Sequence, residues 1–188
     1  MKVKALVLDI DGTVTNSRKE ITPATKAEIH DALERGHKCV LASGRPAFGM
    51  RRYEQELELK RYGGYLLSHN GARVAACGTG EVVFRKALPL ALVPGLYEFA
   101  AENGCGLATH LEDTVISAFA PDRYVSWEAH INEVPVRQVE DFPAFVDFDI
   151  FKCFMTAEDE RAAQLEKKLR AQYGDALAVY RSEPYFIE

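Results

Sequence analysis

The feature that most constrains this chain is a short apolar run near its start that leads directly into two aspartates and a glycine. Residues 4–14 read Lys-Ala-Leu-Val-Leu-Asp-Ile-Asp-Gly-Thr-Val. A continuous apolar run is typical of a central parallel strand, and Gly12 favours a turn where the backbone leaves the sheet. Ligands of open α/β sheets bind at the carboxyl ends of such strands. We therefore expect a strand that ends near Asp9 and places Asp9 and Asp11 at a ligand site.

The two carboxylates are separated by a single residue, so strand alternation directs Asp9 and Asp11 to the same side. Close carboxylates repel each other unless a cation or a shared proton lies between them. A hard cation such as Mg²⁺ suits this arrangement. An Asp-Gly pair is also common in hairpin turns, so the motif alone leaves open a strand followed by an ordinary turn.

The rest of the first half alternates between helical and strand patterns. A helix is predicted from Thr22-Pro23 to Gly36, a second strand over 38–42, a further helix over 48–57 and a third strand over 65–68. Right-handed crossovers would bring the carboxyl ends of all three strands to the same edge of one sheet. The first half therefore predicts an α/β fold with a parallel sheet.

Small and polar residues follow the second and third of these strands. Ser43, Gly44 and Arg45 come directly after 38–42, and Asn70 follows 65–68. If the crossovers have their usual hand, a hydroxyl and a free backbone amide face the aspartates of the first strand. A hairpin is predicted next, over 74–84.

The pattern changes after Leu88-Pro89, where strands and helices no longer alternate. Segregated hairpins favour a small α+β domain with an antiparallel sheet and helices on one face. We therefore divide the chain into residues 1–86 and 87–188, and leave 123–131 unassigned. The elements predicted in the second part are helices over 92–103 and 157–173 and strands over 107–109, 115–117, 149–155, 177–180 and 185–187.

Composition limits the partners that we expect. The chain has 188 residues and a net charge of -5, which disfavours binding to nucleic acid or to an anionic membrane surface. The four cysteines are far apart without a Cys-x-x-Cys pair, which favours buried reduced thiols. No apolar segment is long enough to span a bilayer, and the start lacks a signal-peptide pattern. These observations predict a cytoplasmic protein.

Three motifs together resemble the haloacid dehalogenase superfamily, and specifically its Cof-type sugar-phosphate phosphatases, which carry an α+β cap of class IIB. They are Asp-x-Asp-Gly-Thr-Val at 9–14, Ala-Ser-Gly-Arg-Pro at 42–46 and Asn-Gly-Ala at 70–72. The resemblance covers the whole chain. It implies a Rossmann-like core in residues 1–86 and an inserted cap domain in residues 87–188.

The same resemblance implies roles for individual residues. Asp9 would be the nucleophile and Asp11 the general acid and base, while Ser43 and Gly44 would hold the phosphate. Mg²⁺ would be bound by the Asp9 carboxylate and the Asp11 main-chain carbonyl. The amides of Ile10 and Gly44 and the Ser43 hydroxyl are suitable donors for phosphate oxygens. The candidates for positioning the substrate are Thr13, Arg45 and Asn70.

Two motifs of the superfamily have no counterpart in this chain. These are a lysine and a later acidic pair that completes the metal site, both downstream of the cap. We interpret Lys152 as part of a cap strand and Gly174-Asp175 as a helix end. The chain thus resembles the first part of a core plus a nearly complete cap, and the enzyme interpretation applies to a full-length parent.

A core of three parallel strands would leave apolar surface and an unpaired edge exposed. The residues expected on this surface are Leu6, Leu8, Val40 and Leu66. We expect a homodimer or another contact to cover them.

The function expected from these features is Mg²⁺-dependent hydrolysis of a small phosphorylated metabolite through an aspartyl-phosphate intermediate. A phosphohexomutase-like phosphotransferase is one alternative, because related mutases share the first motif and a similar cap. A noncatalytic module that binds phosphorylated ligands is another, because the lysine and the acidic pair are missing. The reading frame beyond Glu188 would distinguish this module from a partial phosphatase.

Overall fold

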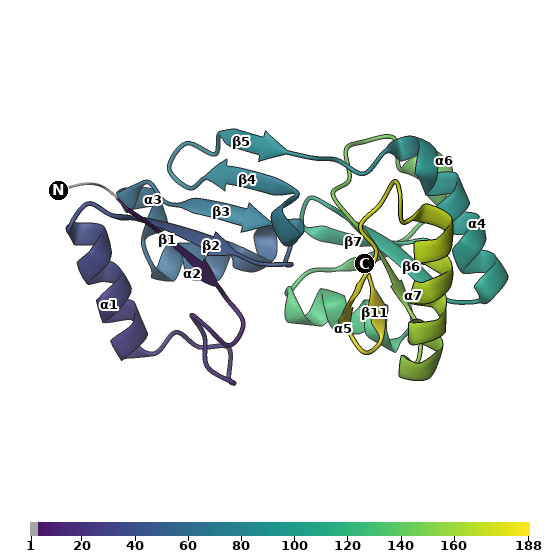
Figure 1. Cartoon of the computed structure of the whole chain (residues 1–188), viewed down its shortest axis with the longest axis horizontal. Coiled ribbons are helices and arrows are strands. Elements are labelled where there is room, and N and C mark those ends of the chain that lie inside the picture. The colour runs from purple at the N-terminus through teal and green to yellow at the C-terminus, as the bar shows by residue number, and fades with distance from the viewer. Residues whose placement is uncertain (1–3) are drawn as a thin grey trace. The chain divides into compact units, whose positions relative to one another are not determined.

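The computed structural model describes residues 4–188 and divides the chain into two compact units (Figure 1). The division lies between Lys86 and Ala87. Each unit has its own sheet.

Unit 1 is a five-stranded sheet in the order β1-β2-β3-β4-β5. Its strands are β1 (Ala5–Asp9), β2 (Lys38–Ala42), β3 (Tyr65–Ser68), β4 (Arg73–Ala76) and β5 (Val82–Arg85). The first three are parallel, and β4 and β5 add an antiparallel hairpin. Asp9 lies opposite Ala42, and Ala42 lies opposite Leu67, so the parallel strands end at one edge. This confirms the predicted α/β fold.

The helices of unit 1 follow the predicted order. They are α1 (Pro23–Glu34), η1 (Phe48–Met50), α2 (Arg51–Glu56), α3 (Leu59–Tyr62) and η2 (His69–Gly71). Helix α1 begins as predicted, because the Thr22 side chain accepts a hydrogen bond from the Thr25 amide and Pro23 occupies the first turn.

The core of unit 1 lies on one face of its sheet. Leu8, Leu41 and Leu66 are in register on this face and pack with α1 and α2. Val40 lies opposite Val7 on the other face, where Val7 is 61% exposed. The prediction that grouped Val40 with Leu8 and Leu66 was therefore wrong, because alternate residues of a strand face opposite ways. Strand β1 is also an edge strand rather than a central one in the sheet formed by the described residues.

Unit 2 contains a six-stranded sheet in the order β10-β11-β9-β6-β7-β8. Its strands are β6 (Gly106–Leu111), β7 (Thr114–Ser117), β8 (Val136–Gln138), β9 (Cys153–Thr156), β10 (Arg181–Glu183) and β11 (Phe186–Ile187). Neighbouring strands are antiparallel except β7 and β8, which are parallel. The sequence did not predict β8.

Helices cover both faces of the second sheet. They are η3 (Leu90–Leu92), α4 (Val93–Asn103), α5 (Arg123–Ile131), α6 (Phe142–Phe145) and α7 (Asp159–Tyr173). Helices α4, α6 and α7 pack on the face that carries Leu107 and Met155, and α5 packs on the face of Ala108 and Phe154. The expectation that all helices lie on one face was wrong, because the segment left unassigned forms α5.

Two predicted strands of unit 2 were also misplaced. Strand β9 begins at Cys153 rather than at 149, and the last hairpin has its first strand at Arg181–Glu183 rather than at 177–180. Apolar residues before each strand pack against the core without joining the ladder, as Ile150 and Leu177 do. Burial alone therefore misled the strand assignment.

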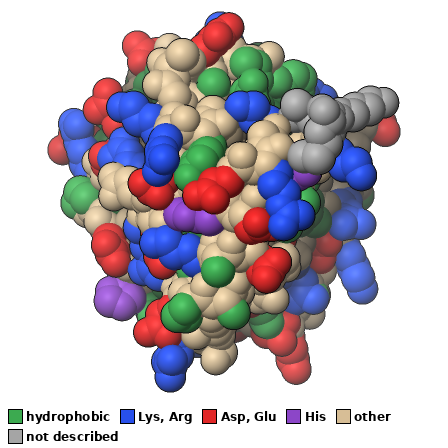
Figure 2. All heavy atoms as spheres, turned by 90° about the vertical axis from the view of Figure 1, so that its left-hand side faces the viewer, with side chains coloured by type: hydrophobic (Ala, Val, Ile, Leu, Met, Phe, Trp, Pro, Cys, Tyr) green, Lys and Arg blue, Asp and Glu red, His purple; other side chains and the backbone are tan. Residues whose placement is uncertain are grey.

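All four cysteines are free, and three of them are buried. Within residues 4–188, none of the helices has both the length and the apolar character needed to cross a membrane. Figure 2 shows the side on which α1 lies in Figure 1, and there acidic and basic side chains are mixed rather than separated by sign.

A buried contact between a histidine and a carboxylate lies between α5 and the second sheet. The Nε2 atom of His110 lies 3.2 Å from the Glu128 carboxylate, and the His110 side chain is only 4% exposed. Burial lowers the pKa of His110 below its ordinary value and outweighs the opposing effect of Glu128. His110 is therefore neutral in the folded protein at pH 7.

We predict that unit 2 loses stability as pH falls below about 6.5. There the unfolded chain takes up a proton on His110 that the folded chain resists. When the unfolded chain binds one proton more than the folded chain, the free energy of unfolding falls by about 1.4 kcal/mol for each pH unit. His110→Gln should therefore flatten the pH dependence of unfolding, followed by the fluorescence of Trp127, the single tryptophan of the chain.

The exposed residue His130 on the same unit provides the control. In His130→Gln, the free energy of unfolding should change with pH as steeply as in the wild type. The comparison covers pH 7.5 to pH 5.5, about one unit on either side of the ordinary histidine pKa. Equal slopes in the wild type and in His110→Gln would contradict the prediction.

Candidate active site

The loop after β1 is held in a tight turn that exposes both aspartates. The Val14 amide donates to the Asp9 carbonyl at 3.2 Å, and the Thr15 amide and hydroxyl both donate to the Ile10 carbonyl at 2.9 Å. Gly12 has φ 83°, a left-handed conformation that the turn requires. The Ile10 side chain is fully buried and anchors the loop, while Asp9 and Asp11, the residues before and after it, are exposed.

The loops after β2 and β3 are joined by backbone hydrogen bonds. The Ser43 amide donates to the Leu67 carbonyl at 2.9 Å, and the Asn70 amide donates to the Ser43 carbonyl at 3.1 Å. The His69 amide also donates to the Arg45 carbonyl at 3.0 Å. The two loops therefore form one framework at the edge where β1 ends.

The side chain of Asn70 lies directly against Gly44. A Cβ atom at Gly44 would lie 2.7 Å from the Asn70 Oδ1 atom, closer than real contacts allow. Asn70 itself has φ 56°, and its neighbours His69 and Gly71 are also left-handed. Asparagine tolerates this conformation better than most residues. Gly44 thus leaves space for the Asn70 side chain, and Asn70 suits the left-handed backbone at its own position.

Two cations hold the carboxylate of Asp11. Arg45 donates from Nε to Oδ2 at 2.9 Å and from Nη2 to Oδ1 at 3.0 Å, and Lys19 donates from Nζ to Oδ1 at 2.7 Å. Partial burial raises the pKa of Asp11, but the hydrogen bonds and positive charges of Arg45 and Lys19 outweigh it and hold the pKa at about 2. Asp11 is therefore ionised at neutral pH in this arrangement.

The carboxylate of Asp9 is in a different environment. Within residues 4–188, no side chain forms a hydrogen bond or an ion pair with it, and the residue is exposed. The same residues contain no cluster of three or more histidine, cysteine or acidic side chains able to hold a metal.

Some of the site residues predicted from the sequence contact one another in the structure, and others only lie in the same loops. The structure joins Asp11 to Arg45 directly and packs Gly44 against Asn70, while Thr13 is exposed in the same loop as the aspartates. Sequence reasoning missed Lys19. Nothing in the local pattern indicated it, because its contact with Asp11 depends on the turn that returns residues 15–21 along the β1 loop through a bridge between Thr15 and Ile21.

Comparison with known proteins identifies the family. The family of haloacid dehalogenase-like hydrolases matches residues 6–188. A haloacid dehalogenase-like hydrolase from Bacteroides thetaiotaomicron is 34% identical with a TM-score of 0.91, over 99% of this chain and 70% of that one. The chain belongs to the haloacid dehalogenase-like hydrolases, as the three sequence motifs predicted.

Two further relatives are similar over nearly the whole chain. YxeH of Bacillus subtilis, named as a candidate phosphatase, is 29% identical over 98% of this chain and 69% of its own length. The subclass IIB sugar phosphatase BT4131 shares the fold with a TM-score of 0.75 at 21% identity, over 98% of this chain and 68% of that one. The chain thus spans about 70% of the length of these relatives.

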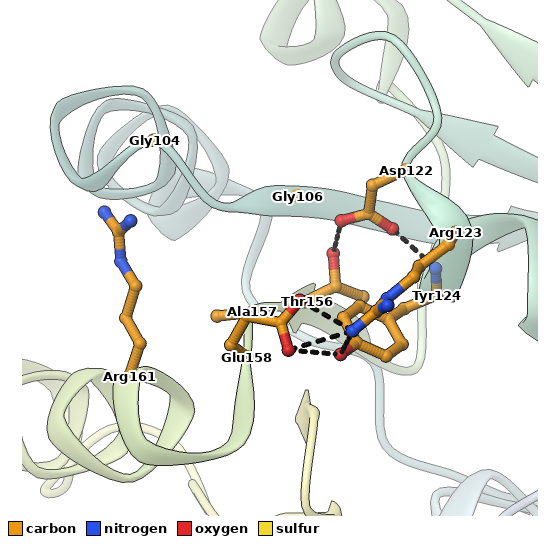
Figure 3. Close-up of a pocket in the computed structure, with 9 residues that line it drawn as sticks. All are labelled: Gly104, Gly106, Asp122, Arg123, Tyr124, Thr156, Ala157, Glu158 and Arg161. Atoms are coloured by element: carbon orange, nitrogen blue, oxygen red, sulfur yellow. Dashed lines mark hydrogen bonds and ion pairs between the residues drawn. The ribbon is translucent and has the colours of Figure 1, made fainter.

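Unit 2 contains an open cavity of about 440 Å³ at the start of β6, the end of β9 and the starts of α5 and α7 (Figure 3). Its charged and polar lining residues bond to one another or to the backbone. Arg123 pairs with Glu158 at 2.7 Å, and Arg161 donates to the Asn103 carbonyl. The Thr156 hydroxyl donates to Asp122, as the close-up shows. Hydrogen bonds and ion pairs of the lining side chains therefore link the ends of helices and strands around the cavity.

We predict that Gly44→Ala destabilises unit 1, because the added methyl group collides with the Asn70 side chain. Asn70→Gly removes the obstructing side chain and suits the left-handed backbone. The double variant should therefore recover stability, with a coupling energy of about 0.5–3 kcal/mol in a double-mutant cycle measured by thermal unfolding.

Gly78 provides a matched control for this substitution. A Cβ atom there would meet only the Lys60 carbonyl at 3.4 Å, an ordinary contact. Gly78→Ala should leave the melting temperature nearly unchanged. Additive effects of Gly44→Ala and Asn70→Gly would show that the two positions are not coupled.

We also predict that Asp122→Ala destabilises unit 2 by about 2–4 kcal/mol. Asp122 caps α5 by accepting hydrogen bonds from the Tyr124 and Val125 amides, and it also accepts the hydroxyl of Thr156, which is 1% exposed. The substitution removes the cap and leaves a buried hydroxyl without its partner. Urea unfolding followed by Trp127 fluorescence measures the loss.

Asp141 is the control, because it caps α6 through the Ala144 amide alone and is exposed. Asp141→Ala should reduce stability by only about 1 kcal/mol. Equal losses for the two variants would show that the bond to Thr156 contributes nothing.

Proposed function

We propose that this protein is a phosphatase that hydrolyses a small phosphate monoester, such as a sugar phosphate, with the help of Mg²⁺. The observation that carries the proposal is the exposed carboxylate of Asp9, which no side chain of residues 4–188 pairs with and which lies at the same sheet edge as the Ser43-Gly44 loop. The names of YxeH and BT4131, a candidate phosphatase and a sugar phosphatase, support the same reaction.

Asp9 is the proposed nucleophile. Its carboxylate attacks the phosphorus atom and displaces the alcohol, and water then cleaves the aspartyl phosphate. The carboxylate is well suited to this role because no cation among residues 4–86 engages it, whereas Asp11 is held by two. Attack therefore requires no ion pair to be broken at the nucleophile.

The loop after β2 supplies the proposed phosphate contacts. The Ser43 Oγ atom accepts a hydrogen bond from the Arg45 amide at 3.2 Å, so its own proton can be donated to a phosphate oxygen. The amides of Ile10 and Gly44 are the other proposed donors. Fixed donors of this kind stabilise the charge on the equatorial oxygens in the transition state.

Mg²⁺ would be held by the Asp9 carboxylate and the Asp11 main-chain carbonyl. The side chain of Asp11 is bound to Arg45 and Lys19, which supports ligation through its carbonyl rather than its carboxylate. A bound Mg²⁺ would neutralise charge on the nucleophile and the phosphate. The two ligands named here are hard oxygen donors of the type that Mg²⁺ prefers.

Asp11 is the proposed general acid and base, and its ion pairs set a condition on this role. With a pKa of about 2, it carries no proton at neutral pH while Arg45 and Lys19 hold it. Protonation of the leaving oxygen therefore requires Asp11 to separate from these cations. Arg45 is then a positioning residue, and Thr13 and Asn70 are proposed to orient the substrate.

We predict that Asp9→Asn lowers the phosphatase activity of the full-length protein by at least about 10³-fold, because an amide cannot form the aspartyl phosphate. Release of phosphate from a chromogenic aryl phosphate is the measurement, with Mg²⁺ and after its removal by EDTA. Asp31→Asn is the control, since Asp31 is an exposed residue paired with Arg35 on α1.

Retained Mg²⁺-dependent activity in Asp9→Asn would contradict the proposed nucleophile. Product analysis with sugar phosphates separates the remaining alternative. Free phosphate identifies a phosphatase, whereas an isomerised sugar phosphate identifies a phosphohexomutase-like transferase.

A further inference from the structure

The outer strand of unit 1 concentrates exposed hydrophobic side chains. Strand β5 is the last in the sheet order and pairs with β4 on one side. Val82, Val83 and Phe84 are 42%, 53% and 51% exposed. These are three of the six large hydrophobic residues that are exposed among residues 4–188, and they are consecutive. In this part of the chain no strand pairs with the other side of β5.

An exposed apolar edge strand is a ready template for pairing with another chain. Proteins usually guard such edges with charges or proline within the strand. The first three residues of β5 contain neither, and the nearest charges are Glu81, directly before the strand, and Arg85, its last residue. Both of these residues are exposed. The edge therefore has an apolar centre bounded by one acidic and one basic side chain.

We propose that β5 pairs with β5 of a second copy of this chain. The two strands run antiparallel about a two-fold axis at Val83, and the pairing joins the two unit 1 sheets edge to edge. Glu81 of each copy then lies opposite Arg85 of the other, and Val82 lies opposite Phe84. The segment is self-complementary in charge and in apolar character, as a two-fold interface requires.

Other pairings of the same segment lack this complementarity. A parallel arrangement in register places Glu81 beside Glu81 and Arg85 beside Arg85, and like charges in this position are unfavourable. Moving the axis to Val82 or Phe84 separates both ion pairs. Charge and hydrophobicity together select the antiparallel register centred on Val83.

The neighbouring strand adds a second electrostatic reason. Arg85 lies opposite Arg73 in the register of β4 and β5, so two positive charges share one end of the hairpin. Glu81 of the second copy would lie beside Arg85 and offset this positive charge. The exposed edge strand β1 lacks such charge complementarity. Antiparallel pairing of two β1 strands about Val7 would place Ala5 opposite Asp9 and engage the candidate nucleophile.

Edge pairing of one short strand buries little area, so we expect a dissociation constant of about 1–100 µM. Sedimentation velocity over about 1 µM to 1 mM protein spans this range. The wild-type chain should change from monomer to dimer across it. Glu81→Arg places two arginines opposite each other in both pairs and should weaken association at least about tenfold.

The charge-swapped variant tests the register. Glu81→Arg combined with Arg85→Glu restores opposite charges and should return association to within about threefold of the wild type. Val83→Lys places two lysines at the two-fold axis and should give a monomer. Trp127→Lys is the control, because Trp127 is similarly exposed at 47% but lies in unit 2, and it should dimerise like the wild type.

A wild-type chain that stays monomeric at every concentration would overturn the proposal. So would a double variant that associates no better than Glu81→Arg, or a Val83→Lys variant that dimerises normally. Circular dichroism and thermal unfolding establish that each variant is folded before its association is measured.

Discussion

The parallel register of β1, β2 and β3 is the constraint on which the candidate site depends. Because Asp9, Ala42 and Leu67 lie side by side in the ladder, the loops that follow begin at the same edge. Hydrogen bonds from Ser43 to the end of β3 and from Asn70 to Ser43 then lock two of these loops together. A slip of one residue between any two strands would turn alternate side chains to the opposite face and separate the loops.

Electrostatics divides the two aspartates of the β1 loop into different roles. Both are exposed at one sheet edge, yet Arg45 and Lys19 engage only Asp11. Neutralising one carboxylate with two cations lowers the repulsion between the two carboxylates. The other carboxylate is left available for chemistry or for a metal. The distinction comes from the surroundings of the two residues, since their side chains are identical.

The two units meet the requirements of burial in different ways. Unit 2 has cores on both faces of its sheet, pairs the buried charges of Lys152 and Glu188, and places the neutral His110 ring beside the Glu128 carboxylate. Unit 1 packs one face of its sheet and leaves hydrophobic side chains exposed on both edge strands. Exposed apolar surface of this kind is a common mark of interaction sites. It is the reason that association is expected through unit 1.

The sequence by itself determined the features that depend on neighbours in the chain. The apolar run before Asp9 gave the strand, Thr22 and Pro23 gave the helix start, and Gly12 gave the turn, because each rests on local backbone geometry. The family motifs could be identified for the same reason. Only the tertiary structure decided the contacts between distant segments. Arg45 reaches Asp11 across 34 positions. The approach of Lys19, the face taken by Val40 and the side chosen by α5 likewise depend on register and packing, which local patterns do not specify.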